Sequence, residues 1–266
     1  MKSIFAPGLF AGEVALVTGG GTGIGLATAR ELGSLGAKLV IASRKPENVE
    51  AGRKALEAEG IEVFATTCDI RDPEQVQALV DGALERFGRI DILVNNAGGQ
   101  FPSPVETMSL RGFDAVIRNN LSGTFYVTHT VATKAMLPQE RGRIVNVIAN
   151  VERGFPGMAH TGAARAGVEN LTRSLAIEWA SRGIRINAVA PGSNIKSSGT
   201  AQYGDELLEM ARKATPLKRL GTPEEVARLI VFLSCFANDY ITGATFYIDG
   251  GQRLWGDIWP IDDATR

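Results

Sequence analysis

Short runs of β-branched and apolar residues alternate along the chain with longer segments of helical periodicity. Seven of these runs are predicted to be strands, at residues 14–19, 38–43, 61–69, 90–98, 142–150, 184–192 and 244–251. Several are apolar on both alternations, which indicates strands that helices cover on both faces. This alternation implies parallel strands joined by right-handed crossovers. We therefore expect one α/β domain over residues 1–266, with a single doubly wound parallel sheet of about seven strands, the Rossmann type.

Two of the helices between these runs have clear start signals. An N-cap residue, a proline at the first helical position and a capping-box residue occur at Asp72, Pro73 and Gln75, and again at Thr222, Pro223 and Glu225. Ligands of doubly wound sheets bind at the carboxyl ends of the strands, where the winding reverses. The loops that follow the strands are therefore expected to hold the chemistry.

Composition and charge narrow the class of protein. The 28 basic and 29 acidic residues nearly balance, so nothing global indicates a nucleic-acid or membrane-surface partner. Cys68 and Cys235 lie far apart in apolar surroundings, without metal or redox spacing, which predicts buried thiols in a reducing compartment and no metal site. With neither a signal peptide at the start of the sequence nor an apolar run of about 20 residues, we expect a cytoplasmic protein.

A glycine-rich segment, TGGGTGIG at residues 18–25, follows the first predicted strand directly. Gly19, Gly23 and Gly25 stand where a turn must tighten, where backbone must approach a pyrophosphate, and where a helix must close on the strand. The N-terminus of that helix offers amide donors to phosphates. An ordinary tight turn is the alternative, but the position after the first strand favours a dinucleotide site.

The end of the second predicted strand indicates which dinucleotide binds. An NAD site usually has an acidic side chain there, whereas this chain has Ser43, Arg44 and Lys45. A hydroxyl and two cations suit a 2′-phosphate, although a solvated basic turn is the alternative. We predict NADP(H) as the cofactor.

These features resemble the short-chain dehydrogenase/reductase family over nearly the whole chain, together with Asp69, NNAG at residues 95–98, Asn120 in NNLSGTF, APG at 190–192 and ITGATFYIDGG at 241–251. The resemblance implies that Asp69 and Ile70 border the adenine and that Asn120 kinks a helix and anchors a water. The implied cofactor-binding set is Gly19, Thr22, Gly23, Ile24, Gly25, Ser43, Arg44, Lys45, Asp69, Ile70, Asn96, Ala97, Gly98, Arg165, Pro191, Gly192 and Ile195. Residues 96–98 would line the ribose side, and the last three would face the nicotinamide.

The chain departs from the family pattern at the catalytic centre. The segment HTGAARAGVENLT, which begins at His160, has Thr161 and Arg165 where the family usually has a tyrosine and a lysine, and NVIAN at residues 146–150 offers no serine. The segments NNAGGQF, ASRK and HTGAARAGVENLTRSLAIEWA resemble most the peroxisomal trans-2-enoyl-CoA reductase branch. In that branch, and in the related dienoyl-CoA reductases, a small hydroxyl residue can occupy the tyrosine position.

This substitution suits one reaction better than another. Ketone reduction forms an alkoxide that must receive a proton from a well-placed acid, and a threonine hydroxyl is too weak an acid. Conjugate reduction of an enoyl thioester instead forms an enolate, which hydrogen-bond donors can stabilise. Thr161 and Arg165 are four positions apart and share a helix face, so Arg165 is expected to hold the nicotinamide ribose and keep positive charge nearby. The candidate donors are Thr161, a water held by Asn120 and, less directly, Asn150.

His160 is a further candidate for the catalytic set of Asn120, Thr161, Arg165 and His160, because histidine titrates near neutral pH. Consecutive helical residues point about 100° apart, so we expect His160 to face away from Thr161. A packing or interface role is the alternative.

The sequence thus predicts an NADPH-dependent reductase of α,β-unsaturated acyl thioesters with an acyl-CoA-like substrate. One alternative is a carbonyl or alcohol oxidoreductase, similar to 3-oxoacyl reductases, that uses His160 or Tyr203 as its acid. Another is a catalytically silent NADP(H)-binding sensor or scaffold. The resemblance also implies a substrate lid around residues 193–220, in which Lys196, Lys213 and Lys218 could meet coenzyme A phosphates, and a homotetramer paired through helices at 114–135 and 160–181.

Overall fold

Seven parallel strands form one sheet in the computed structural model, which describes residues 3–193, 195 and 204–254. The strands are β1 (Val14–Thr18), β2 (Lys38–Ser43), β3 (Val63–Thr67), β4 (Ile92–Asn95), β5 (Gly142–Val147), β6 (Ile184–Pro191) and β7 (Thr245–Ile248). Their order in the sheet is β3-β2-β1-β4-β5-β6-β7, so the winding reverses between β1 and β4. This confirms the predicted doubly wound sheet. The predicted strands from β3 to β7 run too far at their carboxyl ends, where the chain has already entered the loops.

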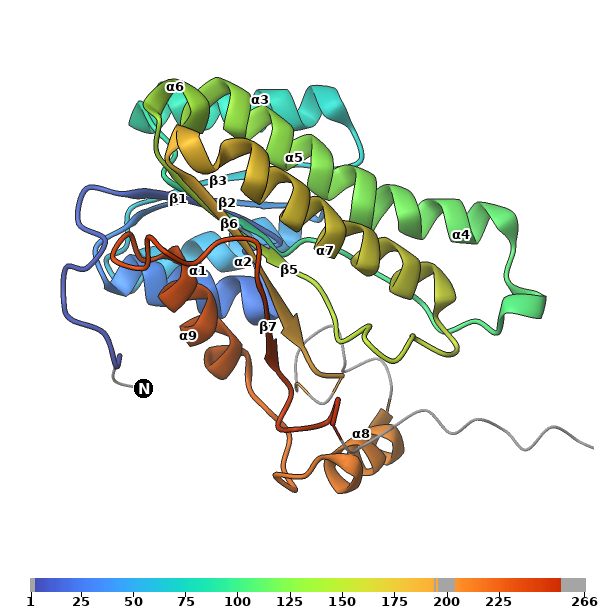
Figure 1. Ribbon diagram of the computed structural model, residues 1–266. Coiled ribbons are helices and arrows are strands. Elements are labelled where there is room, and N and C mark those ends of the chain that lie inside the picture. Colours follow the sequence, from blue (N-terminus) through green and yellow to red (C-terminus); the bar gives the residue numbers. More distant parts are fainter. Residues whose placement is uncertain (1–2, 194, 196–203, 255–266) are drawn as a thin grey trace, which may run out of the picture.

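Helices cover both faces of the sheet (Figure 1). They are α1 (Gly23–Ser34), α2 (Pro46–Glu57), α3 (Pro73–Phe87), α4 (Leu110–Ile117), α5 (Gly123–Val131), α6 (Leu137–Gln139), α7 (Ala159–Trp179), α8 (Gly204–Ala214) and α9 (Pro223–Ser234). Helices α1, α2 and α9 lie on one side of the sheet, and α3, α5 and α7 lie on the other. Each face has its own core, because successive residues of β1 alternate between them: Ala15 and Val17 pack towards α1 and α9, whereas Val14 and Leu16 pack towards α3 and α5.

The two predicted helix starts differ in detail. At α9, Thr222 and Glu225 form the full capping box, as predicted. At α3, the Asp72 carboxylate caps the helix by accepting from the amides of Glu74 and Gln75. The Gln75 side chain donates to Asp72 Oδ2 (2.9 Å) and accepts from the Asp69 amide (3.0 Å). It therefore does not accept from the Asp72 amide, as the predicted capping box requires.

A long helical segment from α4 to α6 contains two π-helical turns, at Arg118–Ser122 and Ala132–Met136. Asn120 lies in the first and is fully buried. The Asn120 side-chain amide donates to the carbonyls of Val116 (3.0 Å) and Gly99 (2.8 Å). The Asn120 backbone carbonyl accepts from the Thr124 hydroxyl (2.8 Å). Side chains that enter the helical hydrogen-bond ladder cause such distortions. The helix thus contains a π-helical turn at Asn120, where the resemblance implies a kink, and the Asn120 side chain ties the helix to the loop after β4.

Both cysteines are free, but only one is buried. Burial raises the pKa of the Cys68 thiol to about 12, which makes this thiol inert. Cys235 is half-buried, so the prediction of two buried thiols is wrong at this position. Across residues 3–193, 195 and 204–254, no helix is long and apolar enough to cross a membrane, and no group of His, Cys, Asp or Glu side chains is arranged to hold a metal ion.

Candidate active site

A cavity of about 430 Å³ opens at the carboxyl ends of the strands. The loops after β1 to β6 all contribute to its wall, because parallel strands bring their carboxyl ends to one edge of the sheet. Of the predicted cofactor residues, sixteen line the cavity: Gly19, Thr22, Gly23, Ile24, Ser43, Arg44, Lys45, Asp69, Ile70, Asn96, Ala97, Gly98, Arg165, Pro191, Gly192 and Ile195. Gly25 lies behind the wall.

The glycine loop packs too closely for side chains. Gly19 has a φ of +66°, and a Cβ on Gly25 would collide with the Gly19 carbonyl oxygen. Asn96 holds this loop against the loop after β4, because its side-chain amide donates to the carbonyls of Thr18 (3.1 Å) and Gly19 (3.3 Å). Gly25 therefore allows α1 to approach the loop, and Asn96 fixes the loop's position.

The N-terminus of α1 differs from those of α3 and α9. Thr22 occupies the N-cap position of α1 without a side-chain cap, and the first turn carries no acidic residue. Asp72 and Thr222 cap the other two helices, whose first turns contain glutamates. Gly23 and Ile24 at the N-terminus of α1 line the cavity, and this first turn adds no carboxylate to the amide donors and the positive dipole end, an arrangement that fits a dinucleotide pyrophosphate.

The part of the cavity wall that follows β2 is basic. Ser43 lines it with the exposed side chains of Arg44 and Lys45, and Asn48 from the first turn of α2 joins them. Asp69 also lines the cavity, but Arg71 Nε donates to its carboxylate (2.9 Å) and lowers the pKa of that carboxyl. Sequence reasoning missed Asn48 and Arg71, because neither belongs to the glycine-loop pattern or to the end of β2.

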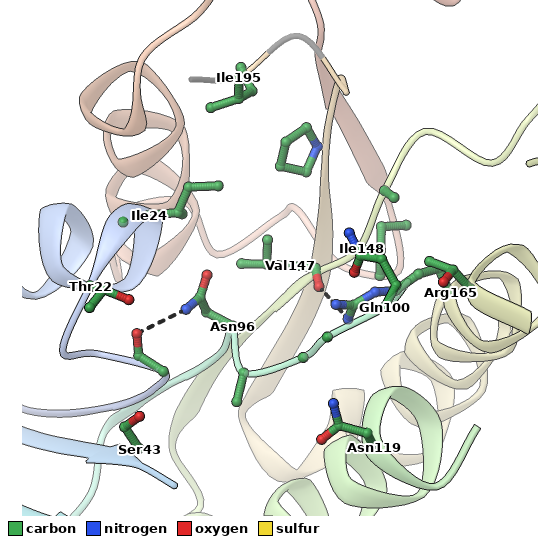
Figure 2. Close-up of a pocket in the computed structure, with 18 of the residues that line it drawn as sticks. Thr22, Ile24, Ser43, Asn96, Gln100, Asn119, Val147, Ile148, Arg165 and Ile195 are labelled. Atoms are coloured by element: carbon green, nitrogen blue, oxygen red, sulfur yellow. Dashed lines mark hydrogen bonds between the residues drawn. The ribbon is translucent and has the colours of Figure 1, made fainter. Parts of the chain in front are cut away.

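Arg165 enters the cavity wall from α7 and is 7% exposed. One of its terminal nitrogens donates to the Val147 carbonyl (3.0 Å), and the other lies against Gly98, where a Cβ would collide with it. Burial lowers the pKa of Arg165 to about 10, which leaves the guanidinium cationic at neutral pH. Figure 2 shows Arg165 next to Ile148 and Gln100. A fixed positive charge therefore lies at the floor of the site.

Thr161 lines the same wall, one turn before Arg165. His160 is fully buried, and its Nδ1 lies 2.7 Å from the Thr161 amide nitrogen and 3.2 Å from Thr161 Oγ1. The prediction that His160 faces away from Thr161 is therefore wrong, because the imidazole turns back towards the next residue. His160, Asn120 and Asn150 lie outside the cavity wall.

The rest of the cavity wall is mainly apolar. It includes Ile148, Phe155, Met158, Ile195, Leu208 and Ala211, with the polar residues Gln100 and Asn119, and Phe155 and Met158 contact the first turn of α7 next to Thr161. Figure 2 shows Asn119 and Gln100 on the side of the site where Arg165 lies. Phe155 and Met158 belong to an irregular loop, which gave the sequence no periodic signal. Leu208 and Ala211 lie on α8, within the predicted lid.

The remaining lid candidates do not enter this wall. Lys213 and Lys218 are exposed, and the Lys218 ammonium donates to the Lys213 carbonyl (2.6 Å). Lys196 and Tyr203 lie outside the described residues. Among the described residues that line the cavity, none carries a phenol.

Comparison with known proteins identifies the family. The family described as enoyl-(acyl carrier protein) reductase matches residues 19–253. A peroxisomal 2,4-dienoyl-CoA reductase of Danio rerio is 37% identical, covering 94% of this chain and 85% of that protein, and a 3-oxoacyl-[acyl-carrier-protein] reductase of Thermotoga maritima is 40% identical, covering 90% and 97%. A solved citronellol catabolism dehydrogenase of Pseudomonas aeruginosa is 44% identical, with a TM-score of 0.86 over 95% of this chain and all of that one. The chain belongs to the short-chain dehydrogenase/reductase family, as the sequence predicted, and is an oxidoreductase of that family.

Proposed function

We propose that this protein is an NADPH-dependent reductase of α,β-unsaturated acyl thioesters. The observation that supports this most strongly is the pair Thr161 and Arg165 in the cavity wall, where the family usually has a tyrosine and a lysine. The wall offers a hydroxyl and a fixed cation to the substrate, but the described residues provide no phenolic acid. Such a site can stabilise negative charge better than it can deliver a proton.

NADPH, when bound, supplies the hydride that the β-carbon of the substrate receives. The negative charge that develops on the thioester oxygen needs donors held in a water-poor site. The Thr161 hydroxyl supplies a neutral donor, and the Arg165 guanidinium supplies positive charge. The α-carbon then takes its proton from water, so no side chain has to act as a strong acid.

The cofactor assignment rests on the basic end of the cavity. Ser43, Arg44, Lys45 and Asn48 gather there, and the end of β2 has no carboxylate to bind an unphosphorylated ribose or repel a 2′-phosphate. Arg44 and Lys45 are exposed in this arrangement and so are available to a phosphate. This composition supports NADP(H) over NAD(H).

The apolar wall near Thr161 supports an acyl substrate. Phe155, Met158 and Leu208 line the same cavity as Thr161 and offer it hydrocarbon, a surface that favours an acyl chain over a polyol. The dienoyl-CoA reductases among the relatives act on unsaturated acyl thioesters, which agrees with this chemistry. The 40% identity to 3-oxoacyl reductases favours the second candidate, reduction of a 3-oxoacyl thioester.

Purified protein tests these candidates by the loss of NADPH absorbance with crotonyl-CoA, acetoacetyl-CoA and a panel of simple ketones. We expect turnover with crotonyl-CoA at a kcat/KM at least tenfold above that with acetoacetyl-CoA. A preference for acetoacetyl-CoA would establish the second candidate instead. NADPH binding without turnover of any compound would identify a silent binding protein and refute the proposal.

A further inference from the structure

We infer that His160 is a positioning residue for Thr161, acting through Nδ1, in the site to which we assign enoyl thioester reduction. This inference rests on the proposed function. Family resemblance gives no role to this position, and His160 itself lies outside the cavity wall. Its effect on a substrate would therefore have to pass through Thr161.

Two groups of Thr161 converge on the same imidazole nitrogen. The Thr161 backbone N–H is shared between His160 Nδ1 (2.7 Å) and the Met158 carbonyl (2.9 Å), and Thr161 Oγ1 lies 3.2 Å from the same Nδ1. A nitrogen that accepts an N–H donor carries no proton of its own, so this contact selects the tautomer with its hydrogen on Nε2. The shorter contact with the N–H occupies most of the single lone pair of Nδ1. The Thr161 hydroxyl hydrogen is then left able to turn towards a substrate oxygen, while its oxygen stays in place.

Packing holds the imidazole in this orientation. His160 is fully buried, and the Phe101 ring meets it in an edge-to-face contact with centroids 4.7 Å apart and planes at 78°. A Cβ on Gly112 would lie 3.0 Å from the tip of Phe101, so α4 supports that ring from behind. The imidazole cannot rotate without disturbing both contacts.

The other nitrogen, Nε2, is buried, and within the described part of the chain it has no hydrogen-bond partner. A donor left unpaired in the interior is unfavourable. The unpaired Nε2–H is therefore an energetic cost of the orientation that keeps Nδ1 against Thr161. His160 is also not among the described residues that line the cavity. His160 therefore positions the hydroxyl and does not itself protonate substrate.

Three substitutions separate the two nitrogens. His160→Asn places an amide oxygen near the position of Nδ1, His160→Gln places its amide near the position of Nε2, and His160→Leu removes both. We expect the kcat for crotonyl-CoA to stay within about threefold for the Asn variant and to fall about tenfold for the Gln and Leu variants. The NADPH dissociation constant, read by nicotinamide fluorescence, should be unchanged in all three, since His160 touches no cofactor residue.

The reverse order, with Gln active and Asn impaired, would overturn the inference in favour of Nε2. Equal losses in all three variants, or no loss in any, would also overturn it, because a packing role does not distinguish the nitrogens. If the Leu variant fails to fold, the Asn and Gln pair still decides the question. A double-mutant cycle adds a second readout: in a Thr161→Val background, His160→Gln should cause no further loss of kcat, and an additive tenfold loss would contradict action through Thr161.

The inference and the proposed function can fail separately. If wild-type protein reduces acetoacetyl-CoA and leaves crotonyl-CoA unchanged, the proposed function fails, and the same variants are measured with acetoacetyl-CoA. The order of Asn over Gln in that assay would still support positioning by Nδ1.

Discussion

Replacing Thr161 by valine tests the role of its hydroxyl with little change in shape. Thr161 is 2% exposed, and its hydroxyl oxygen contacts His160 Nδ1, which keeps the Thr161 backbone N–H as a donor at 2.7 Å. The substitution therefore removes no partner that a described buried polar group depends on. We expect the free energy of unfolding to change by less than about 1 kcal/mol.

The expected effect on catalysis is much larger. Removing one donor from a developing oxyanion lowers kcat by roughly 10²–10³-fold, or about 2.7–4 kcal/mol. Arg165 keeps its positive charge in the variant, so we expect a loss near the lower limit, about 100-fold in kcat with crotonyl-CoA. The affinity for NADPH should not change, since the hydroxyl is not needed to hold the cofactor.

Thr172→Val is the matched control on the same helix. Thr172 is fully buried, but its hydroxyl donates to the Val168 carbonyl (2.8 Å) and accepts from the Asn146 amide (2.9 Å), away from the cavity wall. We expect this control to lose about 1–3 kcal/mol of stability in urea denaturation and to keep its kcat. A Thr161→Val variant that retains wild-type kcat would refute the assignment of the hydroxyl to the reaction.

Four further outcomes follow from the structure. Arg165→Met should raise the NADPH dissociation constant and lower kcat, both measured by titration and initial rates; unchanged binding would place the ribose contact elsewhere. Arg44→Ala should weaken NADPH binding by about 10-fold or more without weakening NADH binding, because it removes a charge-assisted contact to the 2′-phosphate; equal losses for both cofactors would contradict this. Ile177 is 81% exposed on the outer face of α7. We expect light scattering to show a homotetramer that the Ile177→Glu substitution dissociates, and a monomeric wild-type protein would contradict this expectation. Because burial raises the pKa of Cys68 to about 12, its thiolate is scarce at pH 8, so maleimide should leave Cys68 unmodified in peptide mapping, and rapid labelling would contradict its burial.

The sheet and most of the cofactor side could be predicted because each follows from a local pattern. The strands at β1 and β2 are apolar on both alternations, and the glycine spacing permits only a close turn. The wall near Thr161 could not be predicted in the same way. Phe155 and Met158 lie in an irregular loop, and Gln100 follows a strand that the prediction had extended to Gly98, so their positions depend on tertiary packing.

The neighbourhood of His160 shows a second limit of sequence reasoning. The helical period fixes the direction in which a Cα–Cβ bond leaves the backbone, about 100° from that of the next residue. It does not fix how the side chain turns beyond Cβ, and the Phe101 ring and the Thr161 amide decide that here. The close approach of Gly98 to Arg165 has the same origin, because the loop after β4 and helix α7, which are distant in sequence, meet at the sheet edge.

An internal competition tests the central claim most directly. Equimolar crotonyl-CoA and acetoacetyl-CoA are incubated with limiting NADPH that carries deuterium on both faces of the nicotinamide C4, and mass spectrometry reads the label in each acyl product. The ratio of labelled products gives the ratio of the two kcat/KM values in one tube. We predict that labelled butyryl-CoA exceeds labelled 3-hydroxybutyryl-CoA by at least tenfold. A majority of label in 3-hydroxybutyryl-CoA would contradict the claim that this site favours an enolate over an alkoxide.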